Sequence, residues 1–282
     1  MKTVILDHDA GTNPDDFFSL LMLLSDPEVD LKLVISGNNY PMERARFAHK
    51  IVKQHRKTGV TVYAGEATGH IDFNAYQYIE GYEPEIPTDY LTAIKEVLDT
   101  YHDVIYLSIQ GLSNLATFLR TYPAYHDTLD VVHMGMKIDD TNEFIGGGTN
   151  MEADALAAKY VYELGLKRFR VVGSHTTIND AIRITPETAL YKKLDNSDHP
   201  NHQLLMQHLH DYHQRRDIWP ALHDPLTTSV ALGYDFVSFR DYQVEFNDKG
   251  LYRLSDTGMT VTNSEAAINN PEKFMELMVE LV

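Results

Sequence analysis

Near the N-terminus the chain reads Ile5-Leu6-Asp7-His8-Asp9-Ala10-Gly11-Thr12-Asn13-Pro14-Asp15-Asp16-Phe17. The apolar run 4–6 that leads into this stretch is typical of a short buried strand. Asp7 and Asp9 follow at its carboxyl end and point the same way if the strand continues that far. We expect Asn13 to cap a helix whose first residue is Pro14. The stretch therefore predicts a strand, a turn and a helix, with four aspartates around the turn.

The four carboxylates repel one another, and no Lys or Arg lies among them. Asp15 and Asp16 would occupy the first helical turn, where the helix dipole stabilises a negative charge by about 1 kcal/mol or less. That contribution cannot hold four acids together, whereas a bound cation can. Oxygen ligands without cysteine or a local histidine pair suit a hard ion, Ca²⁺ or Mg²⁺. A solvated turn with capping aspartates is the alternative.

Composition narrows the class of protein. The chain has 282 residues, of which 43% are hydrophobic, and 24 Lys and Arg face 41 Asp and Glu, for a formal net charge of −17. A surface this acidic disfavours nucleic acid and membrane partners. The absence of cysteine excludes disulfides and thiolate catalysis. Without a signal peptide, linker or repeat, we expect one domain over 1–282 in a soluble, cytoplasmic protein.

Strands and helices alternate through the first 175 residues, which predicts parallel βαβ units with helices on both faces of the sheet. Strands are expected at 31–36, 60–64, 104–109, 129–134 and 169–172, later ones at 242–246 and 251–254, and helices at 42–54, 90–100, 113–119, 150–164, within 186–216 and from 271. Ligands bind outside the carboxyl ends of such strands. Asp9, Asn38, Ile109, Met134 and Gly173 lie at these ends, so we expect them to share one site.

Aromatic and histidine residues after position 200 are harder to assign. Trp219 directly precedes Pro220 and lies close to His223, which favours a place at the ligand pocket over a place in the core. Tyr212 has the same two alternatives. Histidines at 202, 208, 210 and 213 lack the i,i+4 spacing of a zinc site, and we expect them on the surface.

Six short motifs follow one another in the order found in a known family. They are the aspartate-rich turn with Asp7, Asp9, Gly11, Asp15 and Asp16, then Gly37-Asn38, Gly111-Leu112-Ser113-Asn114-Leu115-Ala116, Asn150 with Asp154, His223-Asp224-Pro225, and Gly258-Met259-Thr260-Val261. In this order the chain resembles the nucleoside hydrolases of the inosine–uridine-preferring type. The resemblance runs over nearly the whole chain and implies a three-layer α/β fold with a mostly parallel central sheet.

The resemblance also implies an activity, which is Ca²⁺-dependent hydrolysis of the N-glycosidic bond of a ribonucleoside in purine or pyrimidine salvage. It implies a Ca²⁺ ion held by Asp9, Asp16, Asp224 and the carbonyl of Ile109. Asp9 would deprotonate the attacking water, and His223 would protonate the leaving base. The residues implied to bind substrate are Asp15, Asn38, Asn142, Asn150 and Asp224, with Trp219 at the base, and we expect a homo-oligomer, a dimer or tetramer.

Two other functions stay open. Gly148 stands where the family usually carries a Glu that binds the 5′ end of the ribose, so a Ca²⁺-dependent nucleoside or sugar binder without turnover is one alternative. The opening Asp7-His8-Asp9 also resembles that of haloacid-dehalogenase-type phosphatases, in which Asp7 would be the phosphorylated nucleophile. That reading leaves His223 and Asp224 without a role.

Overall fold

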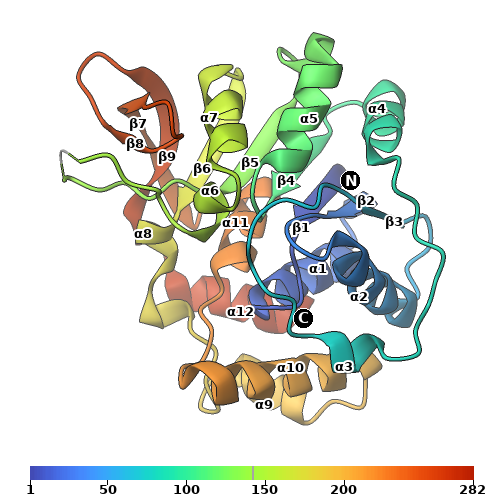
Figure 1. Cartoon of the computed structure of the whole chain (residues 1–282). Coiled ribbons are helices and arrows are strands. Elements are labelled where there is room, and N and C mark those ends of the chain that lie inside the picture. Colours follow the sequence, from blue (N-terminus) through green and yellow to red (C-terminus); the bar gives the residue numbers. More distant parts are fainter. Residues whose placement is uncertain (142) are drawn as a thin grey trace.

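The computed structural model describes residues 1–141 and 143–282, and these residues form a nine-stranded sheet (Figure 1). The strands are β1 (Lys2–His8), β2 (Val29–Ser36), β3 (Thr61–Ala64), β4 (Ile105–Ser108), β5 (Asp130–Gly135), β6 (Arg168–Gly173), β7 (Val237–Phe246), β8 (Tyr252–Leu254) and β9 (Met259–Ile268). Their order is β3-β2-β1-β4-β5-β6-β9-β7-β8. All pairings from β3 to β9 are parallel, and β7 pairs antiparallel with β9 and β8. The expected mostly parallel sheet is confirmed.

Helices cover both faces of this sheet. They are α1 (Asp15–Ser25), α2 (Pro41–His55), α3 (Tyr76–Ile79), α4 (Tyr90–Thr100), α5 (Ser113–Thr121), α6 (Thr149–Ala153), α7 (Ala155–Glu163), α8 (Ser174–Thr177), α9 (Ala189–Asp195), α10 (Pro200–Arg216), α11 (His223–Ala231) and α12 (Pro271–Leu281), with 3₁₀ turns at Pro123–Tyr125 and Asp180–Ile182. The N-terminus is marked beside β2, below α4, and the C-terminus beside α12 (Figure 1).

The buried strands show why three layers form. In β1, Val4 and Leu6 belong to an apolar cluster with α1, α2 and α10 to α12, whereas Ile5 between them belongs to a second cluster with α4, α5 and α7. Tyr106 and Leu107 of β4 divide between the two clusters in the same way. Side chains alternate across a strand, so a strand that is apolar throughout needs a helical layer on each face.

The order of the strands creates a crevice at one edge of the sheet. The chain moves from β1 through β2 to β3 in one direction and from β4 through β5 to β6 in the other. The carboxyl ends of β1 and β4 therefore flank a topological switch point, the usual ligand site of an open parallel sheet. Asp9 follows β1 and Ile109 follows β4 at this point.

Helix α1 begins one residue later than expected. Pro14 is the N-cap, and its carbonyl accepts from the backbone N–H groups of Phe17 (3.0 Å) and Phe18 (3.2 Å). The prediction of a capping Asn13 side chain is therefore wrong, since no side chain caps this helix. Asp15 and Asp16 do occupy the first turn, as predicted.

The helix expected at 150–164 is two helices. Asp154 leaves the helical conformation, with φ −152° and ψ 83°, and separates α6 from α7. Its carboxylate accepts from the N–H of Ala157 (3.0 Å), which caps α7, and from the hydroxyl of Ser113 (2.9 Å). Amphipathic periodicity continues through this break, so the pattern alone did not reveal it.

Four helices and strands have no counterpart among the predicted ones, namely the short helices α3 and α8, helix α11 and strand β9. Helix α11 is buried at every position from Asp224 to Ala231, so its sequence lacks the apolar and polar alternation of a surface helix. Strand β9 carries the polar run 262–264, of which Asn263 and Ser264 are buried, and a polar run of this kind is usually taken for a loop.

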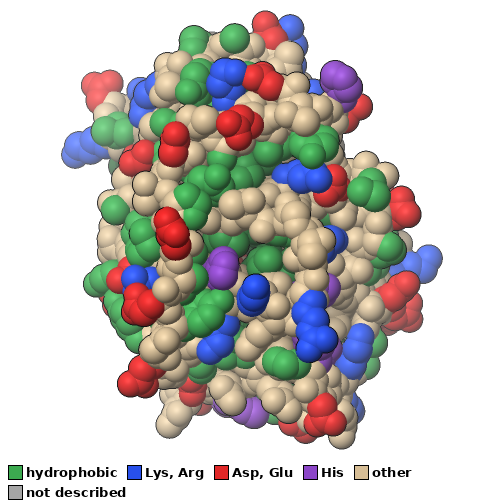
Figure 2. Space-filling model, turned by 90° about the vertical axis from the view of Figure 1, so that its right-hand side faces the viewer, with side chains coloured by type: hydrophobic (Ala, Val, Ile, Leu, Met, Phe, Trp, Pro, Cys, Tyr) green, Lys and Arg blue, Asp and Glu red, His purple; other side chains and the backbone are tan. Residues whose placement is uncertain are grey.

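On the one face that Figure 2 shows, charge is scattered rather than gathered in one patch. On the face that carries α2 and α4, acidic side chains are scattered among Lys and Arg (Figure 2). In the part of the chain that the structure describes, every helix is too short or too polar to cross a bilayer. The exceptional concentration of acid lies inside the molecule, at the switch point.

Candidate active site

A cavity of about 370 Å³ opens at the carboxyl ends of β1, β4 and β5. Its lining comes from eight stretches of the chain: Asp9, Thr12, Asn13, Asp15, Asp16, Ile71, Ile109, Met134, Gly135, Gly147, Gly148, Thr149, Asn150, Ser174, Ile178, Tyr212, Arg216, His223 and Asp224. Five strand-end residues were expected to share one site. Asp9, Ile109 and Met134 do line this cavity, whereas Asn38 and Gly173 are not among its lining residues.

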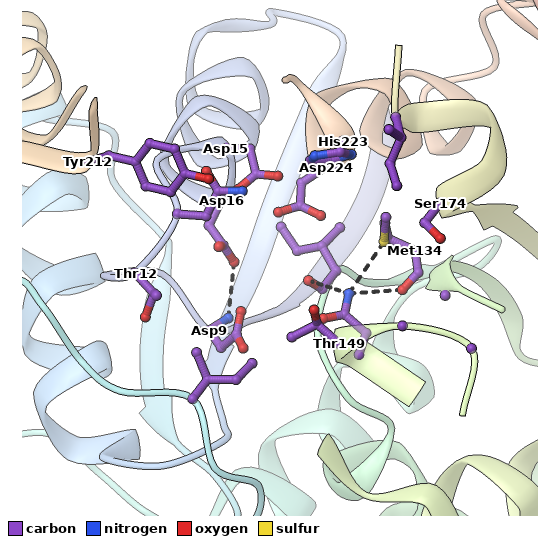
Figure 3. A pocket seen from close by; sticks show the side chains of 18 of the residues that line it. Asp9, Thr12, Asp15, Asp16, Met134, Thr149, Ser174, Tyr212, His223 and Asp224 are labelled. Atoms are coloured by element: carbon purple, nitrogen blue, oxygen red, sulfur yellow. Dashed lines mark hydrogen bonds between the residues drawn. The ribbon is translucent and has the colours of Figure 1, made fainter. Parts of the chain in front are cut away.

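Four buried aspartates form the acidic side of this cavity (Figure 3). Carboxylate oxygens of Asp15, Asp16 and Asp224 lie within 4.8 Å of one another. The backbone N–H of Asp9 donates to Oδ1 of Asp16 (3.1 Å), which ties the end of β1 to the first turn of α1. Asp224 comes from the first turn of α11, more than two hundred residues away in sequence.

Burial dominates the electrostatics of the four acids. It raises the pKa of Asp9, against the charge of Arg44, and raises the pKa of Asp15 to about 7. The pKa values of Asp16 and Asp224 are raised well above the usual range by burial and then by the neighbouring carboxylates. Four acids of this kind, with the carbonyl-bearing Ile109 in the same wall, are a hard, all-oxygen donor set that fits a divalent cation such as Ca²⁺.

Arg44 is the buried cation nearest to this cluster, and its side chain is 0% exposed. Its guanidinium donates to main-chain carbonyls of Asn39 (2.7 Å), Asp9, Ala10 (3.2 Å), Ile71 (2.8 Å) and Asp72 (3.3 Å). One side chain thus joins the turn after β1, the turn after β2 and the segment before α3. It fixes the backbone that carries Asp9 and places a positive charge beside the acids.

Arg44→Met is expected to lower the free energy of unfolding by about 3–5 kcal/mol, because it leaves buried carbonyls and carboxylates uncompensated. Urea unfolding followed by circular dichroism measures the change. Arg46→Met is the control: Arg46 lies on the same helix and pairs with the exposed Glu83 (2.7 Å), so its loss should cost about 1 kcal/mol or less. Equal effects of the two substitutions would contradict the role given to Arg44.

Asn38 lies behind Asp9 rather than in the cavity wall. Its Nδ2 donates to Oδ2 of Asp9 (2.8 Å), and its Oδ1 accepts from the N–H groups of Asn39 (2.8 Å) and Ile71 (3.3 Å). Both ends of the amide are therefore engaged by the protein. The geometry gives Asn38 the task of orienting Asp9, whereas the sequence had suggested contact with the sugar.

Asn150 lines the cavity beside the ends of β4 and β5. Its Nδ2 donates to the carbonyl of Met134 (2.9 Å) and to that of Ile109 (3.2 Å) (Figure 3). This amide thus holds the two strand ends in a fixed relation. Among the described residues Asn150 is the one donor to the Ile109 carbonyl, which leaves its second lone pair for another ligand.

His223 lies next to Asp224 at the start of α11 (Figure 3). Its Nδ1 is 2.8 Å from the hydroxyl oxygen of Thr177, the last residue of α8. Burial, and then the charge of Arg183, lowers the pKa of His223 to about 4. At neutral pH the ring is therefore uncharged, with one nitrogen bonded to Thr177 and the other left for the cavity.

Tyr212 and Trp219, the two aromatic residues expected near the pocket, differ in their position. Tyr212 lines the cavity on the side of α10, which resolves its two alternatives in favour of the pocket. Trp219 is not among the lining residues: its ring stacks on His213, with 4.1 Å between centroids and 5° between planes, and meets Tyr191 edge-on at 5.5 Å. The expected contact of Trp219 with substrate has no support in this geometry, because its face is occupied by His213.

Asp7 is absent from the lining of the cavity. It is 0% exposed and accepts from Tyr106 Oη (2.7 Å), from Asn114 Nδ2 (2.8 Å) and from Gln110. Asp7 and Asp9 were expected to point the same way if the strand continued to Asp9. Strand β1 ends at His8, so this condition is not met, and Asp9 lines the cavity whereas Asp7 does not. A carboxyl enclosed in this way cannot attack a phosphate ester, which removes the phosphatase alternative.

Two further sequence expectations concern the loop between β5 and α6. Asn142, expected to bind substrate, lies outside the described residues. Gly148 lines the cavity with φ +105°, a conformation that disfavours any side chain there. A Cβ atom at this position would have Ser174 Oγ, at 3.7 Å, as its one neighbour within 4 Å among the described residues. The end of the cavity at Gly148 is therefore roomy.

Sequence reasoning missed several site residues, namely Arg44, Thr12, Ile71, Thr177, Ile178 and Arg216. A basic residue in a helix is usually read as part of a solvated face, which hid Arg44. One signal was available: α2 starts directly after the Gly37-Asn38 turn, so its first turn must lie at the same sheet edge as Asp9. Thr177 and Ile178 carry no comparable signal.

Comparison with known proteins identifies the class of enzyme. A family model described as inosine-uridine preferring nucleoside hydrolase matches residues 4–280. The chain is 23% identical over 280 residues to the pyrimidine-specific ribonucleoside hydrolase RihA of Escherichia fergusonii, with 92% of this chain and 88% of that protein covered. The family match spans nearly the whole chain and makes it an N-glycosyl hydrolase.

Solved structures agree in fold. The inosine-uridine preferring nucleoside hydrolase of Bacillus anthracis superposes with a TM-score of 0.79 at 19% identity, covering 100% of this chain and 99% of that one. The purine-preferring ribonucleoside hydrolase of Gardnerella vaginalis gives 0.78 at 21% identity, with 99% of each chain covered. The chain belongs to the inosine-uridine preferring nucleoside hydrolase family, as the order of its motifs predicted.

Proposed function

We propose that this protein hydrolyses the N-glycosidic bond of a ribonucleoside, or a related N-riboside, in a Ca²⁺-dependent reaction that yields free base and ribose. The observation that carries the proposal is one cavity in which four buried aspartates face a neutral histidine. The acids suit a cation and sugar hydroxyls, whereas the histidine suits a nitrogen base. An all-oxygen cation site beside a hydrogen-bond donor is what cleavage between a sugar and a base requires.

The residues that would hold the ion are Asp9, Asp16, Asp224 and the carbonyl of Ile109. When bound, Ca²⁺ would supply positive charge to the buried acids and polarise the attacking water. Asp15 lies beside Asp16 and Asp224, and its Oδ1 has no hydrogen-bond partner among the described residues, so we assign it to the ribose hydroxyls. Asn150 supports the same wall. Asn38 keeps a carboxylate oxygen of Asp9 aimed at the cavity.

Proton movements follow from this arrangement. Asp9 accepts a proton from the attacking water as the water oxygen bonds to the anomeric carbon. His223 donates a hydrogen bond to the departing base as the C–N bond breaks and its electron pair passes to the base nitrogen. The base then takes up a proton from solvent, which balances the proton given to Asp9. The sugar passes through an oxocarbenium-like state, which the surrounding carboxylates stabilise electrostatically.

A reducing-sugar assay on a panel of nucleosides tests the activity directly. The relatives bear the names pyrimidine-specific, purine-preferring and inosine-uridine preferring, so the panel needs purine and pyrimidine ribosides together with 5′-modified ones. The roomy end of the cavity at Gly148 is the reason for the 5′-modified compounds. Nucleoside binding without release of ribose would instead support the non-catalytic binder.

Calcium should both activate and stabilise the protein. Removal of Ca²⁺ with EGTA is expected to abolish hydrolysis, and its return to restore it. Binding at a hundred times the Kd would raise the free energy of unfolding by about 2.7 kcal/mol, which thermal unfolding detects without any substrate. Asp224→Asn should remove this stabilisation. Asp26→Asn, at the far end of α1, should keep it, because Asp26 caps the N–H of Glu28 (2.8 Å) away from the site.

If the melting temperature were the same with and without Ca²⁺, the proposal that Ca²⁺ binds at this site would be wrong. The cytoplasmic location, the role in salvage and the homo-oligomer remain predictions from the sequence.

A further inference from the structure

Thr177 and His223 form an isolated pair at the edge of the cavity. Thr177 is 0% exposed, and its Oγ1 lies 2.8 Å from Nδ1 of His223. Among the described residues neither atom has a second hydrogen-bond partner. Since the remaining ring nitrogen, Nε2, is on the opposite edge of the imidazole, it is the one available to a ligand in the cavity that His223 lines.

The direction of this hydrogen bond follows from counting donors. A threonine hydroxyl has one hydrogen to donate, and an imidazole nitrogen accepts a hydrogen bond only when it carries no hydrogen. If Nδ1–H donated to Thr177, the buried hydroxyl hydrogen would have no acceptor among the described residues. If the hydroxyl donates to a bare Nδ1, both groups are satisfied.

We infer that the Thr177 hydroxyl donates to Nδ1 of His223 and thereby fixes the tautomer in which Nε2–H faces the leaving base. The inference rests on the proposed function and makes Thr177 a positioning residue for it. In the opposite tautomer a lone pair would face the lone pairs of the base, and His223 would repel the group that it has to stabilise.

The neighbourhood of Thr177 is built to hold it in place. The hydroxyl of the preceding residue, Thr176, is 2.6 Å from Ser264 Oγ and donates to the carbonyl of Glu265 (2.7 Å). These contacts fix α8 to β9. The carbonyl of Thr177 accepts from the N–H of Asn179 (2.9 Å), which orients the end of the helix. Thr177 is thus supported by two elements of the scaffold.

Three substitutions distinguish the effect of the Thr177 hydroxyl from the effect of changed packing. Thr177→Val keeps the shape of the side chain and removes the donor, and Thr177→Ser keeps the donor. Thr228→Val is the matched control, because Thr228 lies on the same helix as His223 and its buried hydroxyl has no hydrogen-bond partner in the described part of the chain. We expect Thr228→Val to leave both activity and tautomer unchanged.

The first readout needs no activity. In ¹⁵N-histidine spectra of the full chain, assigned by loss of the His223 signals in His223→Gln, wild type and Thr177→Ser should show Nε2–H and a bare Nδ1. Thr177→Val should show a mixture of tautomers. An Nδ1–H tautomer in wild type, or spectra unchanged by Thr177→Val, overturns the inference. Failure of the wild type to release ribose would overturn the proposed function and leave this result standing.

The second readout is kinetic. Thr177→Val is expected to lower kcat for nucleosides about tenfold with KM little changed, because the tautomer matters as the base departs. The rate with p-nitrophenyl riboside, whose leaving group needs no donor, should stay within about twofold of wild type. Thr177→Ser should restore the nucleoside rate. Equal losses on both compounds would mean that Thr177 serves only packing.

Discussion

Asp9→Asn is expected to abolish hydrolysis of every nucleoside, with kcat/KM falling by about 10⁴-fold or more. The substitution removes the proposed base and one of the proposed ligands of the ion at once. The fold should survive, because Asn keeps an oxygen that can accept from Asn38 Nδ2 and removes one of four repelling buried charges. Initial rates of ribose release, with circular dichroism as a check on folding, measure the effect.

Asp26→Asn provides the matched control for Asp9→Asn. Asp26 is also a buried aspartate, 6% exposed, but it lies at the C-terminal end of α1, away from the cavity. Asparagine there can still accept from the N–H of Glu28, so activity should stay near the wild-type value. Nucleoside hydrolysis by Asp9→Asn that remains within about tenfold of wild type, or about 1.4 kcal/mol, would mean that the role of Asp9 is misassigned.

The parallel half of the fold was predictable because its strands are buried on both faces. Runs such as 31–36 and 129–134 are apolar and short, and the helices between them have one apolar face. Strand-end polar residues then converge by geometry alone, which is why Asp9, Ile109 and Met134 could be placed at one edge in advance. The prediction failed for the antiparallel part of the sheet. Strand β9 buries the polar side chains of Asn263 and Ser264, and Asn263 Oδ1 accepts from the N–H of Ser264.

The acidic residues of the candidate site were predictable from the sequence, whereas the residues that hold them in position were not. Acidic residues clustered in sequence are visible, and Asp224 entered through the order of the motifs. Arg44, Asn38 and Thr177 act by fixing other groups, and such roles depend on which side chains the fold brings within 3 Å. Helix periodicity gives the face of a residue but not the carbonyl opposite it, so the five bonds of Arg44 could not be foreseen.

His223→Ala separates support of the leaving base from a purely structural role. A purine or pyrimidine departs poorly as an anion unless it receives a hydrogen bond or proton, whereas p-nitrophenolate departs readily without either. The substitution should therefore slow natural nucleosides by about 10²–10⁴-fold. It should barely change the hydrolysis of p-nitrophenyl riboside, measured by release of p-nitrophenolate in the same buffer with Ca²⁺.

A purely structural role of His223 predicts a different pattern of rates on the two substrates. If its ring served only to shape the first turn of α11, its loss would displace Asp224, and the acidic cluster would change for every substrate. Both compounds would then slow together, and the stabilisation by Ca²⁺ would weaken in parallel. A selective loss on nucleosides with Ca²⁺ stabilisation intact places His223 at the leaving base, because the ring then acts on the group that departs and not on the acids that hold the sugar.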